Sequence, residues 1–437
     1  MKYYCIGIKG AGMSTLAQLL FDLGYEVSGY DDSTDYKFTQ EGLDKRNIKI
    51  YSKDTIEPLT EDTIVTYSKA FSSDHPELRR VKEANLLIKN YHELIGEISS
   101  KFETICVSGT HGKTTTSSLV THLLQDTIGC NYFIGDGSGF LNKNNSHFVL
   151  ESCEYQKHFL AYFPTYTIIT NIELEHTECY DGIEDIRNTF LTFANKTKKK
   201  IIACGDDENI RKISFSKPVL YYGFNNDNDL TAKNITYSEN GSSFDVYYKN
   251  ELFGHFNLPL FGSHMVLNTL AAIMTGIDLG LSYEQMSSSL LTFENAKRRF
   301  KEEKIKDCII IDDYAHHPTE IEVTLKAARQ KYPNKKIVAI FKPNTYSRTL
   351  EMKDWFKESL SYADDIYVTE IDCNREKASD YHYVTSDVII ENLKNAYKLN
   401  EDNIDVLVNY HDSVLCFMSC ANISHLIDDY KKLKTLD

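Results

Sequence analysis

Short apolar runs alternate with helix-like periodic segments along almost the whole chain. Residues 3–8 read YYCIGI, which predicts a buried strand, and the helical pattern STLAQLLFDLG follows at 14–24. Another strand is predicted at 26–32, the order of strand, glycine turn and helix returns after residue 104, and strands again alternate with helices after residue 308. This alternation predicts an α/β fold built on parallel sheets.

The predicted elements fall into three blocks, each beginning with its own strand. We expect domains at residues 1–98, 99–300 and 301–437, with a change to antiparallel strands at 243–262. Strands of the central block are predicted at 104–108, 148–151, 166–171, 200–205 and 219–224. Strands of the last block are predicted at 308–313, 336–341, 365–370, 405–410 and 413–418.

Composition and charge narrow the function classes. The chain has 437 residues, too many for one ordinary core, and 63 acidic against 48 basic residues give a net charge of −15. This charge argues against nucleic acid as a partner. No apolar run approaches the roughly 20 residues needed to cross a membrane. The ten cysteines lack paired spacing, which is typical of reduced thiols, and we therefore expect a cytoplasmic protein.

The stretch TICVSGTHGKTTTSSL, from residue 104, predicts a phosphate-binding loop between a strand and a helix. Backbone N–H groups at the helix start would face an anion, with the lysine at the terminal phosphates and a threonine hydroxyl placed for Mg²⁺. Val107 stands where the usual pattern has its first glycine, and a plain turn with a threonine-rich helix cap is the alternative. The candidate residues are Gly109, Thr110, His111, Gly112, Lys113, Thr114 and Thr115.

A second glycine turn, GIKGAGM, lies between the first strand and its helix. Gly7, Gly10 and Gly12 do not have the spacing of a dinucleotide fingerprint, although Asp31 lies about 20 residues on. The helix start would serve the diphosphate of another nucleotide equally well. Glycines that serve only close packing are the alternative.

Acidic and imidazole side chains follow two predicted strands of the central block. Glu151 and Glu154 follow the apolar run FVL at 148–150, and Asn171, Glu173 and His176 follow the run YTIIT at 166–170. Carboxylates with a neutral imidazole suit Mg²⁺ bound to phosphates, with Thr114 completing the set. Taken singly, each acid could equally be a solvated loop residue.

Further candidates lie at the junction of the central and last blocks. His264 and Asn268 are four apart on a predicted helix and share a face, as a pair reading a base or ribose would. Arg298 and Arg299 border the junction, where a guanidinium could reach a phosphate. Helix packing and a charged hinge without ligand are the alternatives.

Taken in order, eight segments of the chain resemble the Mur ligases. They read CIGIKGAGMS, GTHGKTTT, CEYQKHFL, TNIELEH, GSHMVLNTLAAI, KRRF, DDYAHHPTEIEVTL and KPNTYSRT. The resemblance implies a UDP-sugar domain, a central ATPase and a Rossmann-like C-terminal domain that closes on the amino acid. It implies ATP and Mg²⁺ as cofactors, and UDP-N-acetylmuramate and L-alanine as substrates in peptidoglycan precursor synthesis. The γ-phosphate would go to the lactyl carboxylate, and the alanine amine would displace it from an acyl phosphate.

The resemblance also assigns roles to individual positions. It implies that Lys113, His176, His316 and Arg348 are catalytic, and that Thr114, Glu151 and His176 hold the metal. The loop Gly10, Ala11, Gly12, Met13 and Ser14, with Asp31, would bind the UDP-sugar. His264, Asn268, Arg299 and Asp313 would hold the nucleotide, whereas Tyr314, His316 and Arg348 would line the amino-acid site. His316, His317 and Asp313 are the candidates for leaving the alanine amine unprotonated.

Two positions depart from the family pattern. Asn344 replaces a histidine after the proline of KPNTYSRT, and the turn at 418–423 reads MSCANI in place of MGAGDI. These changes put the choice of amino acid, or turnover itself, in question. A nucleotide-binding paralogue and a dinucleotide-dependent oxidoreductase are therefore the alternatives to the ligase, although the oxidoreductase leaves the central phosphate loop without a purpose. We expect a monomer or weak dimer.

Overall fold

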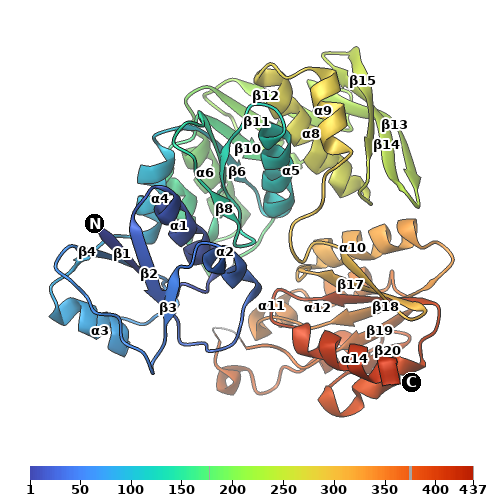
Figure 1. Ribbon diagram of the computed structural model, residues 1–437. Helices are drawn as coiled ribbons and strands as arrows, with labels where there is room; N and C mark the ends of the chain where they lie inside the picture. The colour runs from blue at the N-terminus through green and yellow to red at the C-terminus, as the bar shows by residue number, and fades with distance from the viewer. Residues whose placement is uncertain (177, 374–375, 437) are drawn as a thin grey trace. The chain divides into compact units, whose positions relative to one another are not determined.

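The protein was analysed as a computed structural model that describes residues 1–176, 178–373 and 376–436. Three sheets follow one another along the chain, from blue through green to red in Figure 1. The predicted three-domain α/β fold is confirmed. Within the described ranges, no helix combines the length and apolarity that a membrane span requires.

The first sheet is wholly parallel, with the strand order β3-β2-β1-β4-β5. Apolar side chains of β1 are fully buried, as expected for a central parallel strand. The strands are β1 (Lys2–Ile6), β2 (Glu26–Tyr30), β3 (Lys49–Tyr51), β4 (Thr63–Tyr67) and β5 (Leu87–Ile88). The helices are α1 (Ala11–Asp22), η1 (Phe38–Gln40), α2 (Glu41–Asp44), α3 (Pro76–Glu83) and α4 (Tyr91–Ser99).

The second sheet has the order β15-β14-β13-β12-β11-β10-β6-β9-β7-β8, which places β6 between β10 and β9. Its strands are β6 (Glu103–Ser108), β7 (Asn131–Phe133), β8 (Gly139–Phe140), β9 (His147–Glu151), β10 (Tyr166–Ile169), β11 (Lys200–Cys204), β12 (Val219–Gly223), β13 (Leu230–Ser238), β14 (Gly241–Tyr248) and β15 (Glu251–Leu258). Its helices are α5 (Lys113–Gln125), η2 (Tyr155–Ala161), α6 (Ile183–Ala194), α7 (Glu208–Arg211), α8 (Ser263–Asp278) and α9 (Tyr283–Leu290).

The third sheet has the order β16-β17-β21-β18-β19-β20. Its strands are β16 (Lys301–Ile305), β17 (Cys308–Asp313), β18 (Lys336–Phe341), β19 (Asp365–Val368), β20 (Ala396–Lys398) and β21 (Ser413–Met418). Its helices are α10 (Pro318–Lys331), α11 (Tyr346–Glu351), α12 (Lys353–Leu360), η3 (Ala378–Tyr381), α13 (Asp387–Ile390), η4 (Glu401–Asn409) and α14 (Ser424–Leu436).

By internal packing, the three sheets are grouped into two compact units. The first unit is Met1–Lys233 with Asp245–Phe256 and Leu267–Phe293, and the second is Asn234–Phe244 with Asn257–Val266 and Glu294–Asp437. The phosphate-loop residues and the first glycine turn therefore belong to one unit. The residues from Arg298 to Arg348 belong to the other.

The predicted strand at 405–410 is wrong, because this segment forms the helical turns of η4. Asn400 and Asn403 cap the start of η4. The Asn400 N–H donates to Asn403 Oδ1 at 2.7 Å, and the Asn403 N–H donates to Asn400 Oδ1 at 3.1 Å. Ile404 and Leu407 are three residues apart and both enter the core, which suits a helical turn rather than an extended strand. Strands β16 and β8 also pair antiparallel with β17 and β7, so not every sheet edge is parallel.

Strand β8 is held against α1 by one arginine. The Arg46 guanidinium makes two 2.8 Å bonds to the Asp22 carboxylate and donates to the Gly139 carbonyl at 2.9 Å. Asp22 Oδ2 also accepts from the Leu141 backbone N–H at 3.0 Å. The first glycine turn and the central sheet are thereby packed together within one unit.

We predict that Arg46→Ala lowers stability by about 2 kcal/mol, because it leaves the partly buried Asp22 carboxylate without its bidentate partner. The melting temperature should fall by roughly 5 °C in a thermal scan. Arg79→Ala is the matched control, since Arg79 is exposed on α3. Equal melting temperatures for the two variants would contradict this role for Arg46.

Candidate active site

The phosphate loop connects β6 to α5 and is built on glycine conformations. Gly109 and Gly112 have φ values of +137° and +78°, which other residues adopt only with strain. A Cβ on Gly112 would lie 2.8 Å from the Asn268 side-chain oxygen. Helix α5 has no side-chain cap, so the backbone N–H groups at its start are not occupied by a capping side chain.

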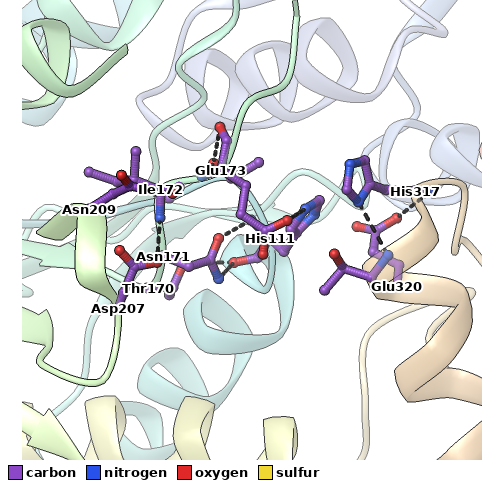
Figure 2. Close-up of polar contacts among 12 residues, drawn as sticks. His111, Thr170, Asn171, Ile172, Glu173, Asp207, Asn209, His317 and Glu320 are labelled. Carbon is purple, nitrogen blue, oxygen red and sulfur yellow. Dashed lines mark hydrogen bonds and ion pairs between the residues drawn. The ribbon is translucent and has the colours of Figure 1, made fainter. Parts of the chain in front are cut away.

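The segment after β10 holds this loop in place (Figure 2). Asn171 accepts from the His111 N–H at 2.7 Å through its side chain, and from the Thr110 N–H at 3.0 Å through its carbonyl. The His111 carbonyl accepts from Asn171 Nδ2 at 3.0 Å and from the Thr170 hydroxyl at 2.6 Å. The backbone N–H and the carbonyl of His111 are therefore both fixed by hydrogen bonds to the segment after β10.

A second layer supports that segment from β11 (Figure 2). Asp207 accepts from the Ile172 N–H at 3.0 Å, and Asn209 donates to the Ile172 carbonyl at 2.8 Å. Burial raises the pKa of Asp207 above its ordinary value, although the backbone N–H bonds oppose this shift. The loop is thus preorganised by two neighbouring strand ends.

Lys113 lies at the start of α5 with its ammonium against the loop carbonyls and one carboxylate. Lys113 Nζ donates to the carbonyls of Gly109 and Thr110 at 2.5 and 2.8 Å, and lies 2.9 Å from Glu154 Oε2. Burial alone would lower the pKa of Lys113, but the Glu154 carboxylate raises it above the ordinary value. The lysine is therefore a fixed positive charge.

The predicted metal residues do not form a single cluster. Thr114 is bonded to Glu151, whereas His176 lies beside Glu154 and Glu175. Thr114 Oγ1 donates to Glu151 Oε1 at 2.9 Å, and Glu151 Oε2 accepts from the Gly135 N–H at 2.6 Å. Glu154, Glu175 and His176 form a separate group whose ligand atoms lie within 4.8 Å of one another. Glu154 and Glu175 are both buried, and Glu154 is the residue that contacts Lys113.

This group suits a hard divalent cation, because it offers carboxylate oxygens and an imidazole beside the phosphate loop. His176 has a φ of +56°, an uncommon conformation that turns the chain at this point. Sequence reasoning did not single out Glu175, although it directly precedes the predicted ligand His176. Glu154 was predicted to lie near the site, but the resemblance did not assign it to the metal.

The first glycine turn lies at the start of α1. Gly10 is the N-cap residue and no side chain caps the helix, so the first N–H groups are available to an anion. Asp31 accepts from the backbone N–H groups of Lys9 and Ser33 at 2.9 and 3.1 Å, which fixes the loop. Met13 and Ser14 are buried in the helix below.

In the second unit, Asp313 is the last residue of β17 and holds the backbone directly after the arginine pair. Asp313 accepts from the N–H groups of Phe300 and Ala315 at 2.7 and 2.8 Å. The Arg299 guanidinium lies 4.9 Å from the centre of the Tyr314 ring. Arg298 instead donates to the carbonyls of Ser419 and Ala421, which assigns it a bracing role on the altered turn.

The altered turn at 418–423 packs at the carboxyl ends of β17, β21 and β18. Ser419 donates to the Asp313 carbonyl at 3.1 Å through its N–H and to the Lys342 carbonyl at 2.9 Å through its hydroxyl. Asn344 Nδ2 lies 2.7 Å from Cys420 Sγ, so the two departures from the family pattern contact each other. Residues 418–423 have no positive φ, so this conformation does not require the lost glycines.

The two neighbouring histidines have different surroundings. His317 is fully buried and caps α10 by accepting from the Thr319 N–H at 3.3 Å. Its position beside Glu320 is drawn in Figure 2. His316 Nδ1 lies 3.0 Å from Glu320 Oε2 and 3.1 Å from the Tyr314 carbonyl, and its ring remains partly exposed. His316 is therefore the better placed of the two for proton transfer.

His264 and Asn268 are one turn apart on α8, as their spacing predicts. Burial lowers the pKa of His264 to about 4, so its imidazole is neutral near pH 7. Arg348 lies on α11. The roles of these residues stay predictions.

We predict a pH-dependent stability effect at Asp313. Burial raises its pKa to about 6, while Arg299 and the two N–H bonds oppose this shift. Since the folded state holds a proton that the unfolded state releases, the stability contributed by this group falls as pH rises from about 4 through about 6. As pH rises from 4.5 to 7.5, the free energy of unfolding of Asp313→Asn should increase by about 2 kcal/mol relative to that of the wild type, measured by thermal unfolding. A stability difference that does not change with pH would contradict the raised pKa.

Comparison with known proteins supplies the family. Models of the Mur ligase family match residues 2–103 (catalytic domain), 107–276 (middle domain) and 298–420 (glutamate ligase domain). The chain is 42% identical over 431 residues to the UDP-N-acetylmuramate–L-alanine ligase of Ligilactobacillus salivarius, covering 99% of this chain and 97% of that protein. It is 43% identical over 433 residues to the ligase of the same name from Pediococcus pentosaceus, covering 99% and 98%.

Solved structures agree with this assignment. The UDP-N-acetylmuramate-alanine ligase MurC of Thermotoga maritima has a TM-score of 0.83 at 25% identity, covering 100% of both chains. A murein peptide ligase from Psychrobacter arcticus, at 22% identity, has the same fold, with a TM-score of 0.75 and coverage of 99% and 98%. With family models matched to most of its length and relatives above 40% identity end to end, the chain belongs to the Mur ligase family.

Proposed function

We propose that the chain is an ATP-dependent amide ligase that joins L-alanine to the lactyl carboxylate of UDP-N-acetylmuramate, a step of peptidoglycan precursor synthesis. The observation that carries this proposal is the preorganised phosphate loop, with Lys113 beside the carboxylates and imidazole of Glu154, Glu175 and His176. Relatives bearing the name of this activity align along almost the whole chain.

The reaction needs two displacements. A carboxylate oxygen of the sugar attacks the γ-phosphorus, ADP leaves, and an acyl phosphate forms. The neutral amine of L-alanine then attacks the acyl carbon, phosphate leaves with the carbon–oxygen bond electrons, and the amide nitrogen loses a proton. Positioning and charge neutralisation are the main demands on the protein.

Lys113 is proposed to neutralise the transferring phosphoryl group. Its ammonium is already desolvated and directed by the Gly109 and Thr110 carbonyls, so little reorganisation is needed when ATP enters. The base would be read by His264 and Asn268, and the ribose by Asp313. Arg299, ordered by the Tyr314 ring, would contact the nucleotide.

Thr114, Glu151 and His176 are proposed to hold Mg²⁺, and the geometry adds Glu154 and Glu175 to that set. Bound there, Mg²⁺ would neutralise negative charge on the phosphate oxygens. The Thr114–Glu151 hydrogen bond orients the hydroxyl, while Glu154 connects the metal group to Lys113.

In the second unit, His316 is proposed to take the proton from the alanine amine. His317 is occupied as the buried cap of α10, which leaves His316 with the acidic partner Glu320. Tyr314 and Arg348 would line the amino-acid site. The unstrained backbone of the altered turn favours an active ligase over a paralogue that only binds nucleotide.

We predict that phosphate release from ATP requires both UDP-N-acetylmuramate and L-alanine, and that Lys113→Gln lowers kcat at least about 10²-fold. Glutamine keeps a donor for the loop carbonyls but lacks the charge. Lys143→Gln, at an exposed loop position, is the control. Retained UDP-sugar binding would show that the variant is folded. Phosphate release that is independent of L-alanine would refute the proposal. A wild-type kcat in Lys113→Gln would refute it as well.

We predict that Glu154→Gln raises the Mg²⁺ concentration needed for half-maximal activity by roughly tenfold, because one charged ligand becomes neutral. Glu151→Gln should raise it as well, since Glu151 orients the Thr114 hydroxyl. Glu208→Gln, an exposed substitution on α7, should leave the Mg²⁺ dependence unchanged. If Glu154→Gln and Glu208→Gln need the same Mg²⁺ concentration for half-maximal activity, Glu154 is not a metal ligand.

A further inference from the structure

Lys69 lies beside the first glycine turn, directly after β4. Strand β4 pairs with β1, and the Ser68 N–H donates to the Ile6 carbonyl at 3.0 Å. A Cβ on Gly7 would lie 3.0 Å from the Ser68 side chain and 2.9 Å from that of Phe71. The segment carrying Lys69 is therefore fixed against the loop that we assign to the UDP diphosphate.

A row of aromatic and imidazole rings leads from that loop toward the phosphate loop. Tyr91 packs so closely on Gly12 that a Cβ there would lie 2.0 Å from its hydroxyl. The rings of Tyr91 and His92 are 4.5 Å apart, and His92 stacks on His158 with a centroid distance of 3.6 Å and an angle of 21°.

The row continues on the far side of this stack. The ring of Tyr155 lies 6.0 Å from that of His158 and 4.9 Å from that of His176, which belongs to the proposed metal group. All of these residues belong to the first compact unit. The row therefore connects the first glycine turn with the proposed metal group.

The ammonium of Lys69 is the positive charge in the middle of the row. Lys69 Nζ donates to Gln156 Oε1 at 2.9 Å and to His158 Nε2 at 3.1 Å. Because an ammonium only donates, both of these contacts use Lys69 as the donor, and neither partner is a carboxylate. In the described ranges no carboxylate lies within 4.0 Å of Lys69, whereas Lys113 has Glu154 as its counter-ion.

His92, the second ring of the stack, is uncharged near pH 7. Burial, with further contributions from His158 and Lys69, lowers the pKa of His92 to about 3. His92 Nδ1 lies 3.1 Å from the Tyr162 hydroxyl, which fixes its ring. His92 is thus uncharged near pH 7 and fixed in place, and its ring supports His158, the Lys69 partner.

The loop that presents this platform is strained. Gln156 and Lys157 have φ values of +50° and +59°, a left-handed conformation that is unfavourable for residues with a Cβ. Phe159 is fully buried and Lys157 Nζ lies 2.9 Å from Asp185 Oδ1, and these contacts hold the strained turn. Strain maintained in this way is typical of functional loops.

We propose that Lys69, held by Gln156 and by the His92–His158 stack, binds the carboxylate of the sugar substrate on its way to the phosphate loop. This inference rests on the proposed function, because it names a subsite of the same substrate. The diphosphate already has the N–H groups at the start of α1, and the single charge of Lys69 matches a single carboxylate. In a chain of net charge −15, such a local cation offsets the unfavourable overall field.

The test compares two ligands by titration calorimetry without ATP: UDP-N-acetylmuramate, and UDP-N-acetylglucosamine, which lacks the lactyl carboxylate. Lys69→Met should weaken binding of the first ligand roughly tenfold and leave binding of the second within about twofold, because only the first loses a charge-assisted hydrogen bond. Lys69→Arg, which keeps the charge, should recover most of the lost affinity. Lys53→Met, at an exposed position after β3, is the control.

Equal weakening of both ligands would overturn the inference, because it would place Lys69 at the diphosphate or the uridine. Unchanged affinity for both ligands would overturn it as well. In each case the proposed function would still stand, since wild-type binding and turnover are measured separately. A wild-type chain that binds neither ligand would overturn the proposed function and this subsite together.

Discussion

The ammonium of Lys113 is held inside the protein against the Glu154 carboxylate, and the central site depends on this pair. Two opposite charges can be buried only if each is hydrogen-bonded and correctly placed. That requirement fixes the carbonyls of Gly109 and Thr110, and with them the positive φ of the loop glycines. It also fixes Glu154 beside His176, so the same contact that stabilises the loop assembles the proposed metal group.

The strand order explains how distant parts of the chain meet at this pair. Because β6 lies between β10 and β9, the phosphate loop, the segment 170–176 and the segment 151–154 all begin at one edge of the sheet. The third sheet repeats the principle with β17, β21 and β18. There Asp313, Ser419 and Lys342 are hydrogen-bonded across adjacent strand ends, which keeps the altered turn at the ligand-facing edge.

Charge is distributed unevenly in a way that suits an anionic substrate. The chain carries a net charge of −15, yet the features that we propose to bind phosphate are helix N-termini and the Lys113 ammonium. Lys113 has the Glu154 carboxylate as its counter-ion, whereas among the described residues Lys69 is hydrogen-bonded to Gln156 and His158. The first arrangement suits a polyanion with several charges, and the second suits a single weakly held carboxylate.

The sequence alone determined the α/β class, the two glycine turns and the family, because apolar period, glycine spacing and short motifs are local properties that one chain segment carries by itself. It failed at 405–410, where apolar residues three apart pack as a helical turn that a strand pattern also matches. The sequence did not show that Glu151 contacts Thr114 while Glu154 contacts Lys113. It also did not show that His317 is the buried cap of α10 and that His316 is the more exposed histidine. Only the tertiary structure decided these, because the direction of a side chain after a strand depends on the loop path and on the neighbouring strand that supplies its hydrogen-bond partner.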